Sequence, residues 1–539
     1  MTTPLFDVVA MTEHWARAHP GTVACHVDRR RRRPETLTYA RLDELITRAA
    51  SRLSRAGLTA GTRAAVMIPP GRELVAVVLA LLRLRAVPVL IDPGLGARAI
   101  GACLAEAAPG AFIGVPRAHL ARAMLGWAAD SVHTTVTLAT RTLWLTRPRT
   151  PYVQAAAGPD ADDLALIAFT SGSTGPPKGV PYRHRHLTGQ TGLLARLGAL
   201  EPGATVYSTF LPFAVAAPSM GCAAVIPRLD LRRPDRTDPA AMARSITTNG
   251  VRGLFAAPAL LDRLARHCLR HGQVLDSVEI VLTAGAPLPY PVLDRARRCL
   301  PAHADVRSVY GATECLLVSM ADDAELTATA PATARGAGTC LGSVLPGNVV
   351  RVIRVTDEPI PHWSDDLMVP PGTVGEITVA GPAVSDPYLA RPHESALARI
   401  DDHGEPVHRM GDLGWQDEQG RLWFAGRKSE RVRTAGGDLY TDQVEPIIDA
   451  LPGVRRSALV GVGPPGGQRP VLCVECEPGT SRRERRDLVE RVRARAITLA
   501  GIAEVLPHRG FPMDVRHASK IRRPFLADWA ARRLGREER

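Results

Sequence analysis

The sequence predicts an α/β fold, and three observations along the chain lead to this prediction. Over the first 150 residues, apolar segments of helical length alternate with short strand-like runs, and strands that alternate with helices normally pair in parallel. Between residues 328 and 412, short strands separated by Gly and Pro turns indicate a small β-barrel-like lobe. After residue 427 the chain becomes basic and rich in helical segments. We therefore expect an N-terminal domain at residues 1–427 and a smaller α+β C-terminal domain at residues 428–539.

Periodicity and flanking residues locate the individual elements. The predicted helices are residues 42–56 and 73–85, and the predicted strands are residues 64–68, 87–91, 164–169, 279–282 and 306–309. The apolar run at 74–82 is too short to cross a membrane, because Arg83 and Arg85 interrupt it. It therefore predicts a buried helix.

The composition excludes a disordered chain and a chain that spans a membrane. The 539 residues are 45% apolar and 22% charged, so large cores can form. The N-terminal residues include acids and no basic stretch, so we expect no signal peptide. The nine cysteines are scattered, as in a reducing cytoplasm, which is the expected location. Cys473 and Cys476 lie in a strand-like run where residues three apart face opposite sides, so we expect no metal or redox pair.

The positive charge is distributed unevenly, and lysine is scarce. The formal charge is +13, and of the 67 basic residues only Lys178, Lys428 and Lys520 are lysines. Residues 451–539 hold 18 arginines and Lys520 against ten acids. Such a module can bind nucleic acid, or it can close over a phosphorylated small molecule. The arginine run at 29–33 has no aromatic residues beside it, so we interpret it as a solvated loop.

A strand followed by a loop rich in hydrogen-bond donors is the strongest local motif. The apolar run 164–169 leads into TSGSTGPPKG at residues 170–179. Glycines let backbone N–H groups approach an anion, hydroxyls add donors, and a lysine supplies a compact positive charge. The spacing fits neither a Walker A loop nor a nucleophile elbow. The residues predicted to bind phosphate are Thr170, Ser171, Gly172, Ser173, Thr174, Gly175 and Lys178.

This loop and the motifs after it resemble the adenylate-forming superfamily, which includes acyl-CoA synthetases, adenylation domains of peptide synthetases and luciferases. The later motifs are AGAP at 284–287, YGATE at 310–314, GDLG at 411–414, GRK at 426–428 and SKI at 519–521. The resemblance implies a large N-terminal domain of packed αβ lobes, a mobile C-terminal domain, and the use of ATP and Mg²⁺. A nucleic-acid-binding protein would leave these motifs unexplained, so we expect no nucleic-acid partner.

The resemblance also implies a role for each motif. Gly285, Ala286 and Pro287 would line the adenine site, where Tyr310 packs on the base next to Gly311 and Ala312. Thr313 would meet the α-phosphate, Glu314 would hold Mg²⁺, and Asp412 would bind the ribose hydroxyls. Arg427 would reach the nucleotide, Lys428 would act as the hinge, and Lys520 would be the adenylation lysine. From the residues alone, a carboxylate beside a phosphate loop is a usual way to bring Mg²⁺ to a nucleotide, whereas Asp412 alone could also cap a turn.

The substrate is expected to be an acid with a lipophilic body. In the amino-acid-activating branch of the superfamily that this chain resembles, an Asp after a Phe meets the substrate ammonium group. The matching stretch here, residues 213–220 (FAVAAPSM), contains no carboxylate, which disfavours an amino acid. The candidate acyl-pocket residues are Phe210, Phe213, Val215 and Met220, and ordinary core packing is the alternative for each. Longer stretches, at residues 91–94, 182–186, 225–230, 337–340, 408–414, 420–424 and 439–446, resemble in particular those of the ATP-dependent β-lactone synthetases of bacterial olefin and β-lactone pathways. Where CoA ligases usually carry an aromatic residue and a base, this chain has Gly436, Gly437 and Asp438, and we interpret the carboxylate as repelling a phosphorylated thiol.

These observations lead to a two-step hypothesis. A β-hydroxy fatty acid attacks the α-phosphate of ATP, with Lys178, Lys520 and Mg²⁺ on Glu314 stabilising charge, and its own hydroxyl then closes a β-lactone. His184 and His186 are candidates for the proton acceptor, and structural packing is their alternative role. The alternative enzyme is a fatty acyl-CoA ligase, or an acyl-AMP ligase that loads a carrier protein, because it shares every ATP motif. An inactive scaffold is disfavoured, because it would not need the lysines and acids of these motifs. Other enzymes of a β-lactone or olefin pathway are possible partners.

The distribution of lysines generates a first prediction. Lys178→Arg and Lys520→Arg should each impair adenylation, because a wide, planar guanidinium fits poorly where a compact ammonium is needed. Lys428→Arg should have a milder effect. ATP–pyrophosphate exchange measures the adenylation activity of all three variants. Near-normal exchange by Lys520→Arg would show that lysine occurs in these motifs by chance.

Overall fold

The chain divides into two compact units. The computed structural model describes residues 7–29, 34–138, 158–170, 175–197, 201–227, 237–513 and 521–537. The first unit comprises Met1–Leu317 and Gly381–Ser395, and the second comprises Val318–Ala380 and Ala396–Arg539. The segment Gly381–Ser395, which we call the strap, therefore belongs to the first unit although the chain on both sides of it belongs to the second. The domain boundary expected at residue 427 falls within the second unit and stays a prediction.

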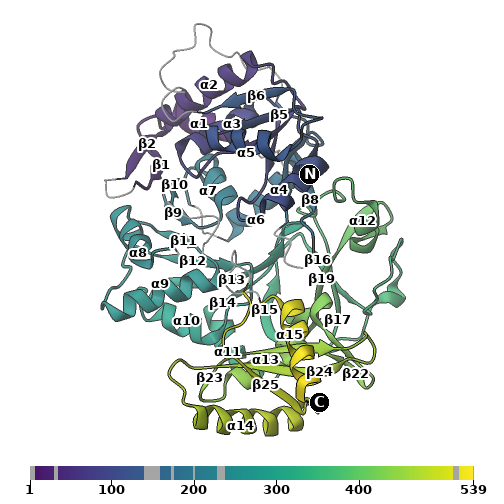
Figure 1. Ribbon diagram of the computed structural model, residues 1–539. Coiled ribbons are helices and arrows are strands. Elements are labelled where there is room, and N and C mark those ends of the chain that lie inside the picture. Colours follow the sequence, from purple (N-terminus) through teal and green to yellow (C-terminus); the bar gives the residue numbers. More distant parts are fainter. Residues whose placement is uncertain are drawn as a thin grey trace. The chain divides into compact units, whose positions relative to one another are not determined.

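One sheet of the first unit has the strand order β6-β5-β3-β4-β7-β8, and Figure 1 labels its strands β5, β6 and β8. Its neighbouring strands are parallel except for β8, which is antiparallel to β7. The strands are β3 (Arg63–Met67), β4 (Val87–Leu90), β5 (Ala111–Gly114), β6 (Thr134–Thr137), β7 (Leu164–Phe169) and β8 (Gly179–Arg183). Helices α3 (Arg72–Arg83), α4 (Ala97–Ala107) and α5 (Pro116–Leu125) connect successive strands, as parallel pairing requires. The predicted α/β alternation is confirmed.

Helix α3 is the buried helix that the sequence predicts, and its last residue has an unexpected position. Every residue from 74 to 82 is buried. Arg83 is only 7% exposed, and its guanidinium lies 3.0 Å from Glu13 and 2.6 Å from Asp43. These carboxylates belong to α1 (Val8–Ala18) and α2 (Tyr39–Arg55), so Arg83 joins three helices. A buried cation is tolerated only with such partners.

A second run of strands in the first unit has the order β2-β1-β10-β9-β11-β12-β13. Neighbours from β1 to β13 are parallel, and β2 is antiparallel to β1. The strands are β1 (Val23–Val27), β2 (Glu35–Thr38), β9 (Thr205–Ser208), β10 (Ala223–Ile226), β11 (Gly253–Phe255), β12 (Ile280–Ala284) and β13 (Asp305–Ala312). The remaining helices of this unit are α6 (His184–Arg196), α7 (Leu211–Ala216), the 3-10 helix η1 (Ala217–Met220), α8 (Pro239–Thr248), α9 (Pro258–Arg270) and α10 (Tyr290–Arg297). Because these strands share one direction, their carboxyl ends lie at one edge of the sheet.

The second unit begins with the predicted β lobe. Its strands follow the order β16-β17-β19-β20-β15-β14, and β18 pairs with β19. All the pairs described among them are antiparallel. The elements are β14 (Cys315–Asp322), α11 (Asp323–Thr333), β15 (Thr339–Val344), β16 (Val349–Ile353), η3 (Asp365–Leu367), β17 (Gly375–Ala380), α12 (Pro392–Ala398), β18 (Arg399–Asp402), β19 (Glu405–Gln416) and β20 (Leu422–Arg427).

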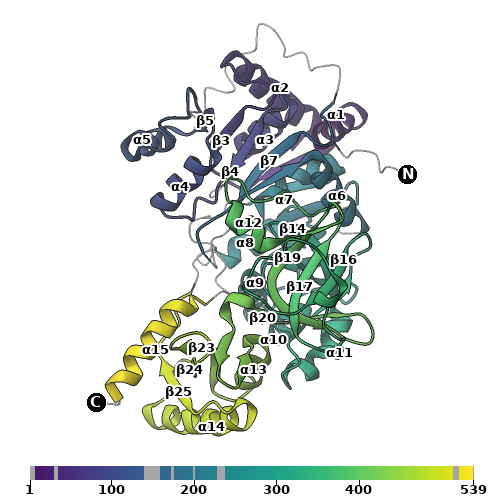
Figure 2. The ribbon, with the colours of Figure 1, turned by 90° about the vertical axis from the view of Figure 1, so that its right-hand side faces the viewer.

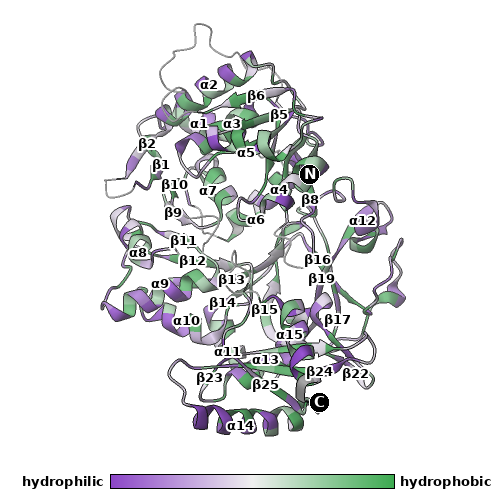
Figure 3. Cartoon of the chain, in the orientation of Figure 1, coloured by the Kyte–Doolittle hydropathy of each residue, from purple (hydrophilic) through white to green (hydrophobic). Residues whose placement is uncertain are grey.

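The last part of the second unit is a small α+β assembly around the sheet β23-β24-β25 (Figure 2). Its elements are η4 (Lys428–Glu430), β21 (Val432–Thr434), β22 (Gly437–Leu439), α13 (Thr441–Asp449), β23 (Val454–Val462), β24 (Arg469–Cys476), α14 (Arg482–Ala500), β25 (Glu504–His508) and α15 (Arg523–Glu537). The hydrophilic residues of α14 stand out in Figure 3. Cys473 packs in the core beneath α15, whereas Cys476 packs against the core that α14 covers. The prediction that these two cysteines face opposite sides of a strand is confirmed.

Two further expectations concern membranes and metals. No helix in the described residues combines the length and apolar character that crossing a bilayer requires. The same residues contain no cluster of three or more His, Cys, Asp or Glu side chains that could hold a metal ion by itself.

Close backbone packing in the β lobe generates a stability prediction. Gly342 has a φ of +73°, and a Cβ there would overlap the carbonyl oxygen of Met320. Gly342→Ala should therefore lower the free energy of unfolding by about 3 kcal/mol, because strain and overlap add. Urea unfolding followed by circular dichroism measures the change.

Gly192 provides a matched control for this substitution. It lies in α6, and a Cβ added there meets nothing within 4 Å. Gly192→Ala should be neutral or stabilise by about 0.5–1 kcal/mol, because alanine favours a helix interior. Equal unfolding midpoints for the two variants would contradict the assigned packing.

Candidate active site

The predicted phosphate loop connects two paired strands. Strands β7 and β8 are antiparallel, with Phe169 opposite Gly179. The amide of Thr170 donates to the carbonyl of Lys178 at 3.0 Å, and the amide of Lys178 donates to Oγ1 of Thr170 at 3.0 Å. Lys178 therefore lies at the base of the loop, directly before the edge strand β8. Ser171, Gly172, Ser173 and Thr174 lie outside the described residues, and Gly175 lies inside them.

The two charged residues predicted to act on ATP are connected through one tyrosine. Thr313 and Glu314 form the two-residue link between β13 and β14. Tyr388 donates its hydroxyl hydrogen to Oε1 of Glu314. The ammonium nitrogen of Lys178 lies 4.7 Å from the centre of the Tyr388 ring, which is a cation–π contact. The hydroxyl of Tyr388 therefore contacts Glu314, and the face of its ring contacts Lys178.

Neighbouring contacts hold the Thr313–Glu314 turn in place. Tyr182 on β8 donates its hydroxyl hydrogen to the carbonyl of Thr313. The carbonyl of Glu314 accepts from the amide of Ser385 on the strap at 2.8 Å. The turn is thus attached both to the strand that follows the phosphate loop and to the strap.

Sequence reasoning did not single out Tyr388 or the strap. The chain has only eight tyrosines, so each is a reasonable candidate to inspect. However, Tyr388 lies in an irregular segment, and its partners Glu314 and Lys178 are 74 and 210 positions away. No local pattern of residues reports contacts across such separations.

The residues predicted to surround adenine gather at one sheet edge. Strands β12 and β13 are parallel, with Ala284 opposite Val309. Gly285, Ala286 and Pro287 directly follow the end of β12, and Tyr310, Gly311 and Ala312 form the end of β13. The two motifs are 25 residues apart in sequence and adjacent in the sheet. Their adjacency supports a shared binding surface, and contact with adenine stays a prediction.

The predicted acyl-pocket residues lie after β9, at the same edge of the same parallel strands. The ring centres of Phe213 and Phe210 lie 5.3 Å and 6.2 Å from that of Phe255. Phe255 is the last residue of β11, and it was not predicted from sequence. Val215 is buried, and Met220 ends η1 with partial exposure. Phe210 remains 43% exposed, so this aromatic cluster has an accessible apolar face.

In the second unit, the predicted ribose and nucleotide residues form an ion pair. Asp412 on β19 is 3% exposed and lies opposite Arg427 of β20 in the strand register. The Nε atom of Arg427 is 3.2 Å from Oδ1 of Asp412. A carboxylate that faces a guanidinium offers oxygen atoms that can accept hydrogen bonds, as binding to a diol requires.

The predicted hinge lysine is held by buried charges. The ammonium nitrogen of Lys428 lies 3.0 Å and 3.1 Å from the two carboxylate oxygens of Glu376, and 2.9 Å from the carbonyl of Thr356. Arg409 donates to the same Glu376 carboxylate at 2.6 Å. Glu376 is 1% exposed and Arg409 is 3% exposed. Burial lowers the pKa of Lys428, and the Glu376 carboxylate opposes this effect.

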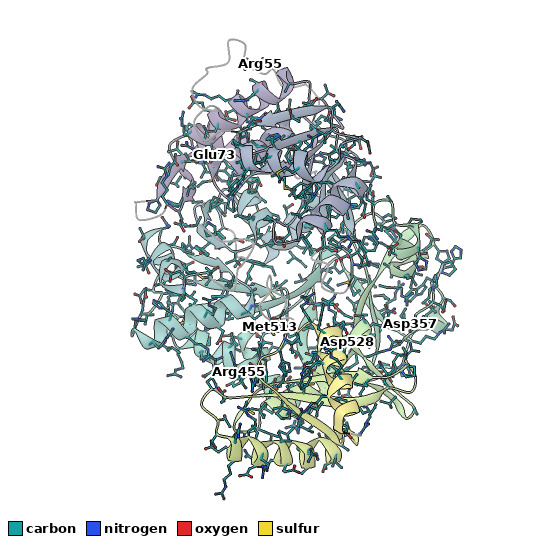
Figure 4. The ribbon with its side chains drawn as sticks, viewed as in Figure 1. Arg55, Glu73, Asp357, Arg455, Met513 and Asp528 are labelled. Carbon is teal, nitrogen blue, oxygen red and sulfur yellow. The ribbon has the colours of Figure 1, made fainter. Side chains whose placement is uncertain are left out.

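Asp438, interpreted from sequence as a repulsive charge, is part of an ion pair in the structure. Its carboxylate lies 3.0 Å from Nε of Arg431. Arg431 also pairs with Asp357, labelled in Figure 4, at 2.7 Å. An ion-paired carboxylate is partly neutralised, so this residue alone does not discriminate against a phosphorylated thiol.

The predicted adenylation lysine, Lys520, lies outside the described residues, but its flanks are described. Met513 (labelled in Figure 4) and Ile521 form an antiparallel bridge. Arg523, the first residue of α15, lies 2.6 Å from Glu445 and 2.9 Å from Glu430. The start of α15 is therefore fixed within the second unit by a half-buried arginine with two carboxylates.

The two histidines considered as proton acceptors have structural contacts. His186 accepts a hydrogen bond at Nδ1 from the amide of Arg183, at 3.0 Å, and so caps the start of α6. His184 is 5% exposed, and burial lowers its pKa. The cap made by His186 and the burial of His184 favour a structural role for both residues over proton transfer.

Comparisons with known proteins identify similar chains. The family model described as "AMP-binding enzyme" matches residues 12–389. The chain is 47% identical to an olefin beta-lactone synthetase of Xanthomonas campestris pv. campestris, over 92% of this chain and 91% of the relative. It is 44% identical to an olefin beta-lactone synthetase of Stenotrophomonas maltophilia, over 98% of both chains. A structure of O-succinylbenzoate coenzyme A synthetase from Bacillus subtilis, in complex with ATP and a magnesium ion, aligns with a TM-score of 0.75 at 20% identity, covering 95% of this chain and 98% of that one. This last likeness concerns the fold alone.

The buried charges around Lys428 generate a prediction. Glu376→Gln should lower the free energy of unfolding by about 3–5 kcal/mol, because Arg409 and Lys428 would lose their shared counter-charge in a buried site. Urea unfolding measures this loss. Glu418→Gln changes an exposed carboxylate of the same unit and should shift the value by less than about 0.5 kcal/mol. Identical unfolding curves for the two variants would show that the negative charge of Glu376 does not stabilise the fold through Arg409 and Lys428.

Proposed function

Because this chain belongs to the AMP-binding enzyme family and is an AMP-forming ligase, we propose that it converts a β-hydroxy fatty acid into a β-lactone. The substrate class is a long-chain 2-alkyl-3-hydroxy acid, and the co-products are AMP and diphosphate. The observation that carries the proposal is the 44–47% identity, over at least 91% of both partners, to two chains named olefin beta-lactone synthetase. Identity of this extent covers the acyl-pocket region as well as the ATP motifs.

The first step is adenylation. A carboxylate oxygen of the substrate bonds to the α-phosphorus of ATP while the bond to the diphosphate oxygen breaks. Lys178 stabilises the charge on the phosphate oxygens, and Lys520 stabilises the approach of two anions to one another. Thr313 donates to the α-phosphate, Asp412 accepts from the ribose hydroxyls, and Arg427 orients that carboxylate. Catalysis of this kind consists mainly of positioning and charge stabilisation.

The residues present fit a magnesium-bound nucleotide. Protein sites for Mg²⁺ at ATP commonly supply one or two carboxylates and leave the other positions to phosphates and water. Glu314 is one such carboxylate, and the described residues around it contain no cluster that would hold a metal without a nucleotide. Bound Mg²⁺ would neutralise negative charge on the phosphates. Glu314 would hold it there.

The second step closes the ring. The 3-hydroxyl oxygen of the substrate attacks the acyl carbon of the adenylate, AMP leaves, and the hydroxyl proton passes to a base or to water. The competing reaction is hydrolysis, so the site must orient the hydroxyl and exclude water. The apolar cluster of Phe210, Phe213 and Phe255 offers a surface of suitable character for the alkyl chains.

A fatty acyl-CoA or acyl-AMP ligase is the alternative, because it shares the adenylation step and differs only in the acceptor. The ion pair between Asp438 and Arg431 supports this alternative, because a paired carboxylate repels a phosphorylated thiol acceptor less than a free one does.

Product analysis distinguishes the two functions. With ATP, Mg²⁺ and a 2-alkyl-3-hydroxy acid, we expect a β-lactone, identified by mass and NMR, and one AMP per lactone. The matched 2-alkyl acid without the hydroxyl should release diphosphate in a single turnover and yield no lactone. Thioester formed efficiently with CoA, and no lactone in its absence, would establish the ligase instead.

A further inference from the structure

The strap is attached to both charged motifs of the first unit. The amide of Ser385 donates to the carbonyl of Glu314 at 2.8 Å, and the amide of Leu389 donates to the carbonyl of Gly179 at 2.8 Å. Gly179 directly follows Lys178. The strap backbone therefore crosses between the turn that carries Glu314 and the base of the phosphate loop.

Side chains fasten the strap to the same surroundings. Arg391 lies 2.7 Å from Glu106, whose other carboxylate oxygen accepts from the amide of Gly179 at 2.8 Å. At the opposite end, a Cβ on Gly189 of α6 would lie 2.7 Å from the carbonyl oxygen of Pro382, so the helix and the strap pack backbone to backbone. These contacts leave the strap little freedom between its ends.

Tyr388 occupies the middle of this attachment. Its side chain is 9% exposed, its hydroxyl donates to Oε1 of Glu314, and its ring face contacts the Lys178 ammonium at 4.7 Å. Within the described part of the chain, Oε2 of Glu314 accepts no hydrogen bond. One oxygen of the carboxylate is thus held by the tyrosine, and the other is available to a ligand.

We propose that Tyr388 is a positioning residue that acts on both Glu314 and Lys178 through separate parts of its side chain. The hydroxyl sets the direction of the Glu314 carboxylate, so that Oε2 faces a divalent cation in a fixed orientation. The ring restricts the flexible Lys178 side chain and keeps its ammonium near the same place. This inference rests on the proposed roles of Glu314 and Lys178 in binding the magnesium complex of ATP.

The two functions of the side chain are separable by substitution. Tyr388→Phe removes the hydroxyl and retains the ring, so it should weaken divalent-cation binding roughly tenfold, as the loss of groups that orient metal ligands does elsewhere. The same variant should leave the affinity for metal-free nucleotide within about twofold. Tyr388→Leu removes the ring as well, so it should also weaken metal-free nucleotide binding roughly three- to tenfold, because Lys178 would have to be ordered on binding.

Direct binding measurements test these expectations without turnover. Mn²⁺ binding is titrated by electron paramagnetic resonance with the α,β-methylene analogue of ATP, which cannot be cleaved, and nucleotide binding is measured again in EDTA. Tyr290→Phe is the matched control, because Tyr290 is 45% exposed on α10 and should alter neither affinity. Thermal melting of each variant establishes that it is folded.

The outcomes separate this inference from the proposed function. If Glu314→Gln abolishes nucleotide-dependent Mn²⁺ binding and Tyr388→Phe leaves it at the wild-type affinity, positioning by Tyr388 is refuted while the role of Glu314 stands. If Glu314→Gln binds Mn²⁺ as the wild type does, the proposed metal role of Glu314 fails first, and the inference fails with it. Equal loss of metal-free nucleotide binding in Tyr388→Phe and Tyr388→Leu would refute the separation of the two functions.

Discussion

The shared direction of the parallel strands is the constraint on which the candidate site of the first unit depends. Strands β9, β11, β12 and β13 all end at one edge, so whatever follows each strand is delivered to the same place. The motifs predicted to surround adenine lie just after β12 and at the end of β13, and the phenylalanine cluster lies just after β9 and at the end of β11. A nucleotide surface and an apolar surface can therefore adjoin without any special loop. Reversing one of these strands would remove its motif from this edge.

The strap adds what the sheet edge alone does not provide. Lys178 directly precedes the edge strand of one sheet and Glu314 lies on a turn beyond the other, so strand pairing alone does not join the two residues. Backbone bonds from Ser385 and Leu389 attach one short segment to both. An opposite-charge pair in direct contact would partly neutralise itself, whereas Tyr388 contacts the two residues through separate parts of its side chain.

Charge compensation is a recurring feature of this arginine-rich chain. Arg83 and Arg409 are buried and Arg523 is half-buried, and each has a carboxylate within 3.0 Å. Such pairs avoid the large cost of an isolated buried charge. The lysines differ from these arginines in setting: Lys178 lies against an aromatic face, and Lys428 shares one carboxylate with an arginine.

The sequence by itself determined the α/β class, the strands and helices that periodicity predicted, the buried character of helix α3, and the order of the nucleotide motifs. These properties are local, because propensity, alternation and glycine-rich spacing act over a few residues. Only the tertiary structure decided that Tyr388 connects Lys178 with Glu314, that Phe255 joins Phe210 and Phe213, and that Arg431 neutralises Asp438. Most of these contacts join residues far apart in the chain, and all depend on how strands and loops pack in space. Local spacing along the sequence does not encode that packing, because it does not specify which distant segment each side chain will contact.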